Sequence, residues 1–218
     1  MSQPSIRSRD PLQPTWEIAY LYPAQGAWSE EEYLALDTSR LVEFSDGQVE
    51  VLPLPTTTHQ FIVGFLYRLL EAFASAGQLG QTVTAPLRVR LWPGKYREPD
   101  VVFLRREHAN RMTEQFWAGA DLVMEVISDD DRRRDVETKR REYARARIPE
   151  YWLVDPQAET ITILRLTGKR YILHGLFRAG EMAESALLPG FTVDVAAVFK
   201  QKLRTERQAQ RTPRKPRR

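Results

Sequence analysis

The chain has 218 residues, a formal net charge of +3 and no cysteine. This length fits one domain with a substantial core, and the lack of cysteine excludes disulfide scaffolds, thiolate zinc sites and cysteine nucleophiles. There is no apolar segment long enough to span a membrane and no apolar stretch typical of a signal peptide, so we expect a cytoplasmic protein without a membrane partner.

The positive charge is concentrated at the C-terminal end. Residues 200–218 carry nine Lys or Arg and one Glu, which leaves a net charge of −5 on the other 199 residues. Because this tail has almost no apolar residues, we expect it to be disordered. It is either a solubilising extension or a nonspecific grip on nucleic-acid phosphates, and a nuclease domain would favour the second interpretation.

The first half of the chain indicates helices and a hairpin. In chain order, the patterns predict an irregular extension over residues 1–28, a short helix capped by Ser29, a hairpin around residues 45–47, and a long helix from His59 to about Ala76. Thr57 or Thr58 can cap the long helix, its apolar residues recur at helical spacing, and Gly77 is the expected stop.

The second half reads mainly as strands. We expect strands at residues 82–92, 100–104 and 121–127, a helix over 135–147 that ends before Pro149, and strands at 150–155, 160–166 and 169–174. Residues 191–199 close the ordered part. With no internal repeat and no clear linker, the simplest account is one mixed α/β domain over residues 29–199.

Two carboxylates break the apolar pattern of neighbouring strands. Asp100 comes directly before the strand at 101–104, and Glu125 lies inside the apolar run at 122–127. A carboxylate is costly to bury unless it is paired or coordinates a cation. If both side chains face the same side of the sheet, they can hold Mg²⁺ or Mn²⁺, which prefer oxygen ligands. Alternatively, Asp100 caps a turn, and Glu125 pairs with Arg88 or Arg90.

The helix expected at residues 135–147 offers a third polar group. Asp135 and Lys139 are four residues apart, so they share one helix face, which Tyr143 continues. The pair could be a surface ion pair worth only a few tenths of a kcal/mol. Lys139 could instead reach over the strand ends toward a metal, where it would orient water or neutralise charge on a phosphate oxygen.

Several stretches together resemble one family. They are EPDVVF at 98–103, DLVMEVIS at 121–128, DVETKRREYARARIPEYWLVDP at 135–156 and LVEFSDGQVEVLPLPTTTHQFIVGFL at 41–66. In order and spacing they resemble the Uma-type family of restriction endonucleases, within the PD-(D/E)xK nuclease superfamily, over about residues 29–195. The resemblance implies a restriction endonuclease-like core, in which a central mixed sheet is flanked by helices and the metal site lies at the edge of the central strands.

The resemblance also implies roles for individual residues. Asp100 matches the motif Asp, and Glu125 matches the motif acid. The usual superfamily Lys would fall at Ile127, and in the Uma-type proteins a Lys of the following helix takes its place, which here is Lys139. Glu43 matches an N-terminal acidic residue that can complete the metal shell, although a hairpin residue could equally be exposed.

Supporting roles are less specific. His59 matches a His at the start of the family's helix, where it could simply pack or could contact a phosphate. Asp135 could orient Lys139. A basic run is most simply a solvated loop, but it lies where a nucleic-acid backbone could pass; it consists of Arg132, Arg133 and Arg134.

The implied activity is that of an endonuclease that uses Mg²⁺ or Mn²⁺ to hydrolyse phosphodiester bonds of nucleic acid, with DNA as the expected substrate. Superfamily members often cut two strands as pairs, so a homodimer is expected by analogy. One alternative is a nuclease fold that has lost catalysis and acts as a nucleic-acid or protein binding module. Another is a metal-independent hydrolase that uses Asp100 and Glu125 as an acid/base pair.

Overall fold

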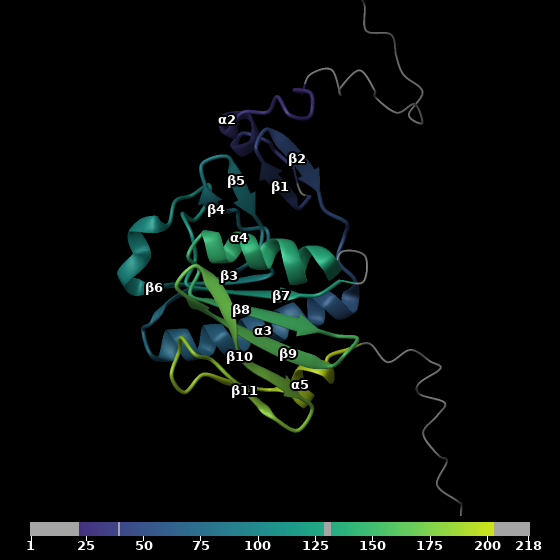
Figure 1. The fold of residues 1–218 in the computed structure, drawn as a ribbon, viewed down its shortest axis with the longest axis vertical. Coiled ribbons are helices and arrows are strands. Elements are labelled where there is room, and N and C mark those ends of the chain that lie inside the picture. Colours follow the sequence, from purple (N-terminus) through teal and green to yellow (C-terminus); the bar gives the residue numbers. More distant parts are fainter. Residues whose placement is uncertain (1–21, 39, 129–131, 203–218) are drawn as a thin grey trace, which may run out of the picture.

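The structure is a computed structural model that describes residues 22–38, 40–128 and 132–202. Most of the predicted N-terminal extension and the basic tail beyond Lys202 lie outside these residues. The described chain forms a six-stranded and a four-stranded sheet joined by short connections, and a separate two-stranded sheet, with helices packed against the two larger sheets (Figure 1). None of the described helices is both long and apolar enough to cross a bilayer.

The larger sheet is mixed, as predicted. Its strand order is β10-β9-β8-β7-β6-β3, and β7 pairs in parallel with β8 while the other neighbours are antiparallel. The strands are β3 (Gly80–Thr84), β6 (Val101–Arg105), β7 (Leu122–Val126), β8 (Glu150–Asp155), β9 (Thr160–Thr167) and β10 (Arg170–Arg178). All residues of the central strands β7 and β8 are buried, which is why their sequences are nearly continuous apolar runs.

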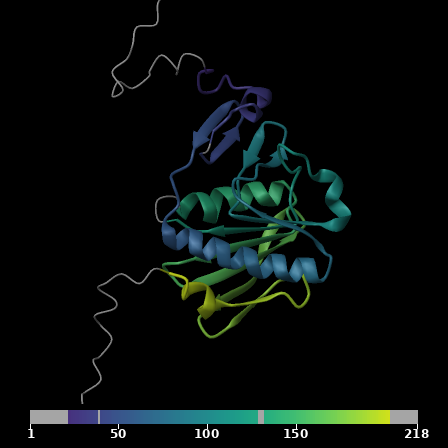
Figure 2. The same cartoon turned by 180° about the vertical axis from the view of Figure 1, so that it is seen from behind.

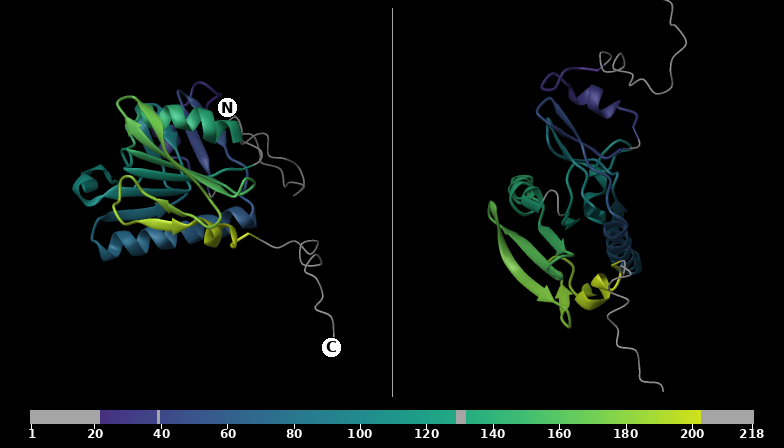
Figure 3. Two further views of the ribbon diagram at one scale, coloured as in Figure 1. Left: turned by 60° about the horizontal axis from the view of Figure 1, so that its bottom comes forward. Right: turned by 90° about the vertical axis from the view of Figure 1, so that its right-hand side faces the viewer.

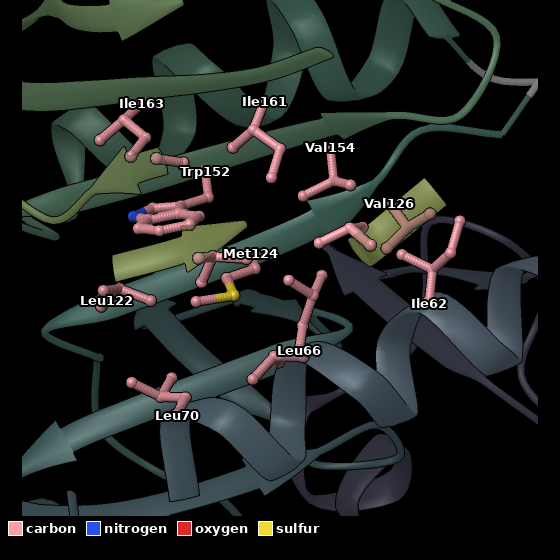
Figure 4. Packing of buried hydrophobic residues seen from close by; sticks show 14 of the residues in the cluster. Ile62, Leu66, Leu70, Leu122, Met124, Val126, Trp152, Val154, Ile161 and Ile163 are labelled. Atoms are coloured by element: carbon pink, nitrogen blue, oxygen red, sulfur yellow. The ribbon is translucent and has the colours of Figure 1, made fainter. Parts of the chain in front are cut away.

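Helix α3 (Thr57–Ala76) covers one face of this sheet and is seen in front of it in Figure 2. Its apolar stripe packs on alternate residues of the central strands, and α5 (Val195–Phe199) joins it on the same face. Figure 4 shows this packing between α3 residues Ile62, Leu66 and Leu70 and the strand residues Leu122 and Met124. The strands therefore offer their other alternate residues to the opposite face.

That opposite face is covered by a helical segment that begins as the π-helix η2 (Arg134–Lys139) and continues as α4 (Arg140–Arg145). In the buried cluster on this side, Val123 packs with Tyr143 and Tyr151. Because side chains alternate along β7, Glu125 points to this face as well. The helix predicted over residues 135–147 is thus confirmed, with a widened turn at its start.

The smaller sheet has the order β2-β1-β5-β4 and lies at one end of the molecule together with α2 (Figure 3, right). Its strands are β1 (Val42–Ser45), β2 (Gln48–Val51), β4 (Val89–Trp92) and β5 (Lys95–Arg97), and α2 spans Glu30–Leu34. Ser29 caps α2 in a capping box with Glu32, which confirms the predicted cap. The hairpin turn is confirmed between β1 and β2, where Asp46 and Gly47 both have positive φ.

The structure differs from two sequence expectations. The single strand expected over residues 82–92 is wrong, because β3 and β4 belong to different sheets, and the break falls at Pro86, which has no N–H to donate to a sheet ladder. The cap of the long helix is Thr56, whose hydroxyl accepts a hydrogen bond from the His59 N–H, rather than Thr57 or Thr58. Gly77 is confirmed as its C-cap.

The remaining elements close the fold. The 3-10 helix η1 (Arg106–Arg111) follows β6, and a two-stranded sheet pairs β11 (Met182–Glu184) with β12 (Thr192–Asp194).

Two connections between the sheets position the site. The chain passes from β5 in the four-stranded sheet to β6 in the six-stranded sheet through residues 98–100. The connection from β2 to α3, residues 52–56, crosses the same junction.

Candidate active site

A pocket of about 490 Å³ lies at the junction of the two sheets. Its lining includes six of the residues singled out by sequence: His59, Asp100, Glu125, Arg134, Asp135 and Lys139. These residues come from the start of α3, the approach to β6, the strand β7 and the helix η2. The fold thus brings together side chains that are up to 80 positions apart in the sequence.

Asp100 and Glu125 are adjacent because of the strand register. Val101 of β6 pairs antiparallel with Met124 of β7, which places Asp100 opposite Glu125. The Asp100 Oδ2 atom accepts a hydrogen bond of 2.7 Å from the Val126 N–H, and the His59 Nε2 atom lies 3.2 Å from the same oxygen. The Asp100 side chain keeps 14% of its surface exposed, so it is fixed but reachable from the pocket.

Glu125 is almost fully buried and has two polar partners. The Tyr143 hydroxyl donates to its Oε1 over 2.6 Å, and the Lys139 Nζ lies 2.9 Å from its Oε2. The alternative that an arginine pairs with Glu125 is wrong, because Arg88 donates to the Leu34 carbonyl and Arg90 stacks over a phenylalanine ring. The carboxylate in the apolar strand is thus compensated from the facing helix.

Lys139 also contacts Asp135, at 3.0 Å, so its ammonium bridges two carboxylates inside a buried site. The i,i+4 pair is therefore not a solvated surface pair. Burial alone would lower the pKa of Lys139, but the charges of Glu125 and Asp135 outweigh it and hold that pKa above its usual range. The lysine is a charged ammonium at neutral pH.

The pKa of Glu125 is raised as well, which for a carboxyl group favours the neutral form. Burial raises the pKa of Glu125, Lys139 partly offsets this, and the neighbouring charges of Asp100 and Asp135 raise it further. For His59, burial would lower the pKa, but its hydrogen bond to Asp100 and the charge of that carboxylate raise it overall. Negative charge is therefore concentrated at one spot in the pocket, which a cation would stabilise.

The carboxylates of the pocket suit a hard divalent cation that takes only two of its ligands from the protein. Among residues 22–38, 40–128 and 132–202, no three His, Asp or Glu side chains converge as a metal-binding group. Mg²⁺, however, is often held by one or two carboxylates, with water and substrate phosphate oxygens completing its shell. Asp100 and Glu125, side by side and facing one pocket, fit that kind of site.

Glu43 has a different environment. It is fully buried on β1, and its carboxylate is bound by the guanidinium groups of Arg97 and Arg134 and by the Glu98 N–H. Burial would raise the pKa of Glu43, but the charges of Lys139, Arg97 and Arg134 lower it to about 2. The exposed hairpin interpretation is thus wrong, and a role in the metal shell remains a prediction.

The three consecutive arginines occupy different environments. Arg133 is 87% exposed, and Arg132 pairs with Asp155 while 48% of its side chain stays exposed. Arg134 lines the pocket and pairs with Glu43. Nucleic-acid contact by all three remains a prediction, but a solvated loop does not describe Arg134.

Glu98 and the hydroxyl of Tyr143 are polar groups of the site that sequence reasoning missed. Glu98 lines the pocket and accepts the Val42 N–H at 3.0 Å, and burial, with a smaller contribution from the Glu43 charge, raises the pKa of Glu98 to about 7. The signal that could have identified it is its place two residues before Asp100 at a strand start. Tyr143 shares the helix face of Lys139, which was the available signal.

A mixed sheet flanked by helices, with two carboxylates and a lysine converging at adjoining strands, is the arrangement expected for a restriction endonuclease-like protein. The family profile Uma2, described as "Putative restriction endonuclease", matches residues 30–196. The chain therefore belongs to this family.

Comparison with solved structures supports the fold. The structure is similar to that of a protein from Anabaena variabilis described as "a putative nuclease belonging to DUF820", with a TM-score of 0.67 and 16% sequence identity. The similarity covers 81% of this chain and 99% of that chain. No curated protein sequence matches the chain significantly.

Proposed function

We propose that this protein is an endonuclease that uses Mg²⁺ or Mn²⁺ to hydrolyse phosphodiester bonds of DNA. The observation that carries the proposal is the convergence of Asp100, Glu125 and Lys139 in one pocket. Membership of the Uma2 family supports the nuclease class. We further propose that the domain extends over residues 29–199 and that it works as a homodimer, by analogy with superfamily members.

Each residue has a distinct task in this proposal. Asp100 and Glu125 would hold the cation, which when bound would lower the pKa of water and polarise the phosphodiester. Glu43 could complete the shell only if its arginine partners moved. Lys139 orients the attacking water or neutralises the charge that develops on the phosphate oxygens. Asp135 and His59 are positioning residues, because Asp135 contacts Lys139 and His59 contacts Asp100.

The test is cleavage of supercoiled plasmid by the wild-type protein and by Glu125→Ala, each with Mg²⁺, Mn²⁺ or a chelator. Glu107→Ala is the matched control, because Glu107 is an exposed carboxylate paired only with a surface arginine among the described contacts. We expect metal-dependent cleavage by wild type and the control and none by Glu125→Ala. Equal cleavage by all three proteins would refute the site, and activity that survives the chelator would favour a metal-independent hydrolase.

One observation favours a second candidate. The Lys139 ammonium already lies 2.9 Å from Glu125 and so neutralises the carboxylate that a cation would use. A nuclease fold that binds nucleic acid without cutting it would have this property. Retention of plasmid binding without cleavage, together with Mg²⁺ affinity that is unchanged in Asp100→Ala, would support this candidate.

A further inference from the structure

The candidate site has an apolar wall that the proposed chemistry does not use. On one side of the pocket the lining consists of Leu and Pro side chains, and we call this surface the leucine–proline wall; its residues are Leu41, Leu52, Pro53, Leu54 and Pro55. Residues 52–55 connect β2 to the N-cap of α3. The wall therefore adjoins the start of α3, where His59 contacts Asp100.

The wall is exposed at a cost in free energy. Leu54 is 76% exposed, the largest value among the large hydrophobic side chains of the described residues. Apolar surface that lies in a pocket and is not covered by the protein's own chain is typical of a ligand-binding surface. An exposed leucine beside a cluster of charged groups is suited to bind a ligand that has both an apolar face and a charged group.

The wall is also preformed. Pro53 and Pro55 flank Leu54, and each proline ring fixes its own φ and restricts the residue before it. The Leu52 N–H donates to the Leu41 carbonyl over 2.9 Å, which ties the segment to the end of the hairpin. Little conformational entropy is then lost when a ligand packs against it.

The neighbouring carboxylates indicate the occupant. In the proposed function, on which this inference rests, the scissile phosphodiester lies at Asp100 and Glu125, so the group within reach of the wall is the adjoining nucleoside. In a duplex the faces of each base are covered by stacking, whereas an unpaired base exposes an apolar face. A pocket of about 490 Å³ also has the size of a small-ligand site rather than a duplex groove.

We propose that the leucine–proline wall packs against an unpaired nucleobase next to the scissile phosphate, so that the preferred substrate is single-stranded DNA. The wall side chains carry no hydrogen-bonding groups, so this contact selects for an unpaired base without selecting its identity. Leu54 is then a specificity-determining residue.

The test is the affinity of the full chain for a fluorescein-labelled DNA single strand and for the matching duplex, measured by fluorescence anisotropy without divalent cation. The variant is Leu54→Ser, and the matched control is Val51→Ser, because Val51 is 57% exposed but does not line the pocket. We expect wild type to bind the single strand more tightly than the duplex. Leu54→Ser should weaken single-strand binding by about tenfold and leave duplex binding unchanged, and Val51→Ser should bind both DNAs as wild type does.

Two results would overturn the inference: unchanged single-strand binding by Leu54→Ser, or an equal loss for strand and duplex. Either would assign the wall to another partner, such as a protein. A second arm adds Mg²⁺ and follows cleavage of the same two DNAs. If Leu54→Ser shows the binding defect but no protein cleaves, the proposed function fails and the inference stands. If wild type cleaves DNA with Mg²⁺ but Leu54→Ser binds both DNAs as wild type does, the proposed function stands and the inference fails.

Discussion

The Lys139 Nζ atom lies 2.9 Å from the Glu125 Oε2 atom, and both side chains are more than nine-tenths buried. These residues are 14 positions apart, on a helix and on the strand it covers. Ile127, at the position of the usual superfamily lysine, is buried in the apolar cluster on the same face. The covering helix thus supplies the positive charge of the site, because Lys139 lies on η2 and β7 carries no lysine.

Removing this lysine should destabilise the fold. Lys139→Met leaves Glu125 and Asp135 without their buried cation, and we expect the free energy of unfolding to fall by about 3–5 kcal/mol. The double variant Lys139→Met/Glu125→Gln should recover part of that loss, because it removes the unpaired carboxylate. Urea unfolding measures the change in unfolding free energy for the single and the double variant. The control is Arg141→Met, at an exposed position, which should change stability by less than about 0.5 kcal/mol. Strictly additive effects would contradict the coupling.

Glu43 should matter for stability even without metal. Glu43→Gln leaves the Arg97 and Arg134 guanidinium groups without a buried carboxylate, so the unfolding free energy should fall by about 3 kcal/mol in the presence of a chelator. Glu50→Gln is the matched control, because Glu50 pairs with the same Arg134 but is 56% exposed, and it should cost at most about 1 kcal/mol. If Glu43→Gln changes only metal affinity, its contribution is that of a ligand rather than of an ion pair.

Glu142 should make stability depend on acid pH. Burial would raise the pKa of Glu142, but Arg97 and Lys95, whose nitrogens lie 2.7 Å from its oxygens, outweigh this and lower the pKa below 4.5. A group whose pKa is lower in the folded state stabilises the fold above the unfolded pKa, and this stabilisation is lost as the pH falls through the folded pKa.

The measurement compares urea unfolding of wild type and Glu142→Gln at about pH 6 and about pH 3.5. Wild type should be the more stable protein at the higher pH, and the difference should shrink at the lower pH. A difference that is constant or grows on acidification would contradict this assignment.

The basic tail should contribute affinity but not sequence preference. Residues 203–218 carry seven Lys or Arg, and Lys202, the last described residue, lines the pocket. Truncation after Lys202 should weaken DNA binding for all sequences and reduce its dependence on salt, by about 0.9 in the log–log slope for each phosphate that the tail no longer neutralises. Binding is followed by anisotropy over a salt series. An unchanged slope would support the alternative of a solubilising tail.

Local sequence patterns are enough to predict the elements that position the site. The hairpin at Asp46 and Gly47, the long α3 helix and the strand around Glu125 each follow from spacing or turn chemistry that acts over a few residues. The side-by-side placement of Asp100 and Glu125 also follows, because it needs only neighbouring strands and a shared face. The nuclease class follows from the family resemblance rather than from these patterns.

Contacts between distant segments cannot be predicted in this way. Arg134 belongs to a run that reads as a solvated loop, but it lies on η2 and pairs with Glu43, which is 91 positions away on the smaller sheet. The partners of Glu125 come from the covering helix rather than from the preceding strand. Both outcomes depend on how η2 packs between the two sheets, and no local pattern encodes that.

The most direct test of a divalent cation at Asp100 and Glu125 is a titration of Mn²⁺ followed by electron paramagnetic resonance of the free ion. Wild type, Asp100→Asn and the control Asp46→Asn are compared, since Asp46 is an exposed turn residue outside the pocket. We expect Mn²⁺ binding by wild type and the control that is abolished or strongly weakened in Asp100→Asn. Equal Mn²⁺ binding by all three proteins, or none by wild type, would contradict a cation site at these two carboxylates.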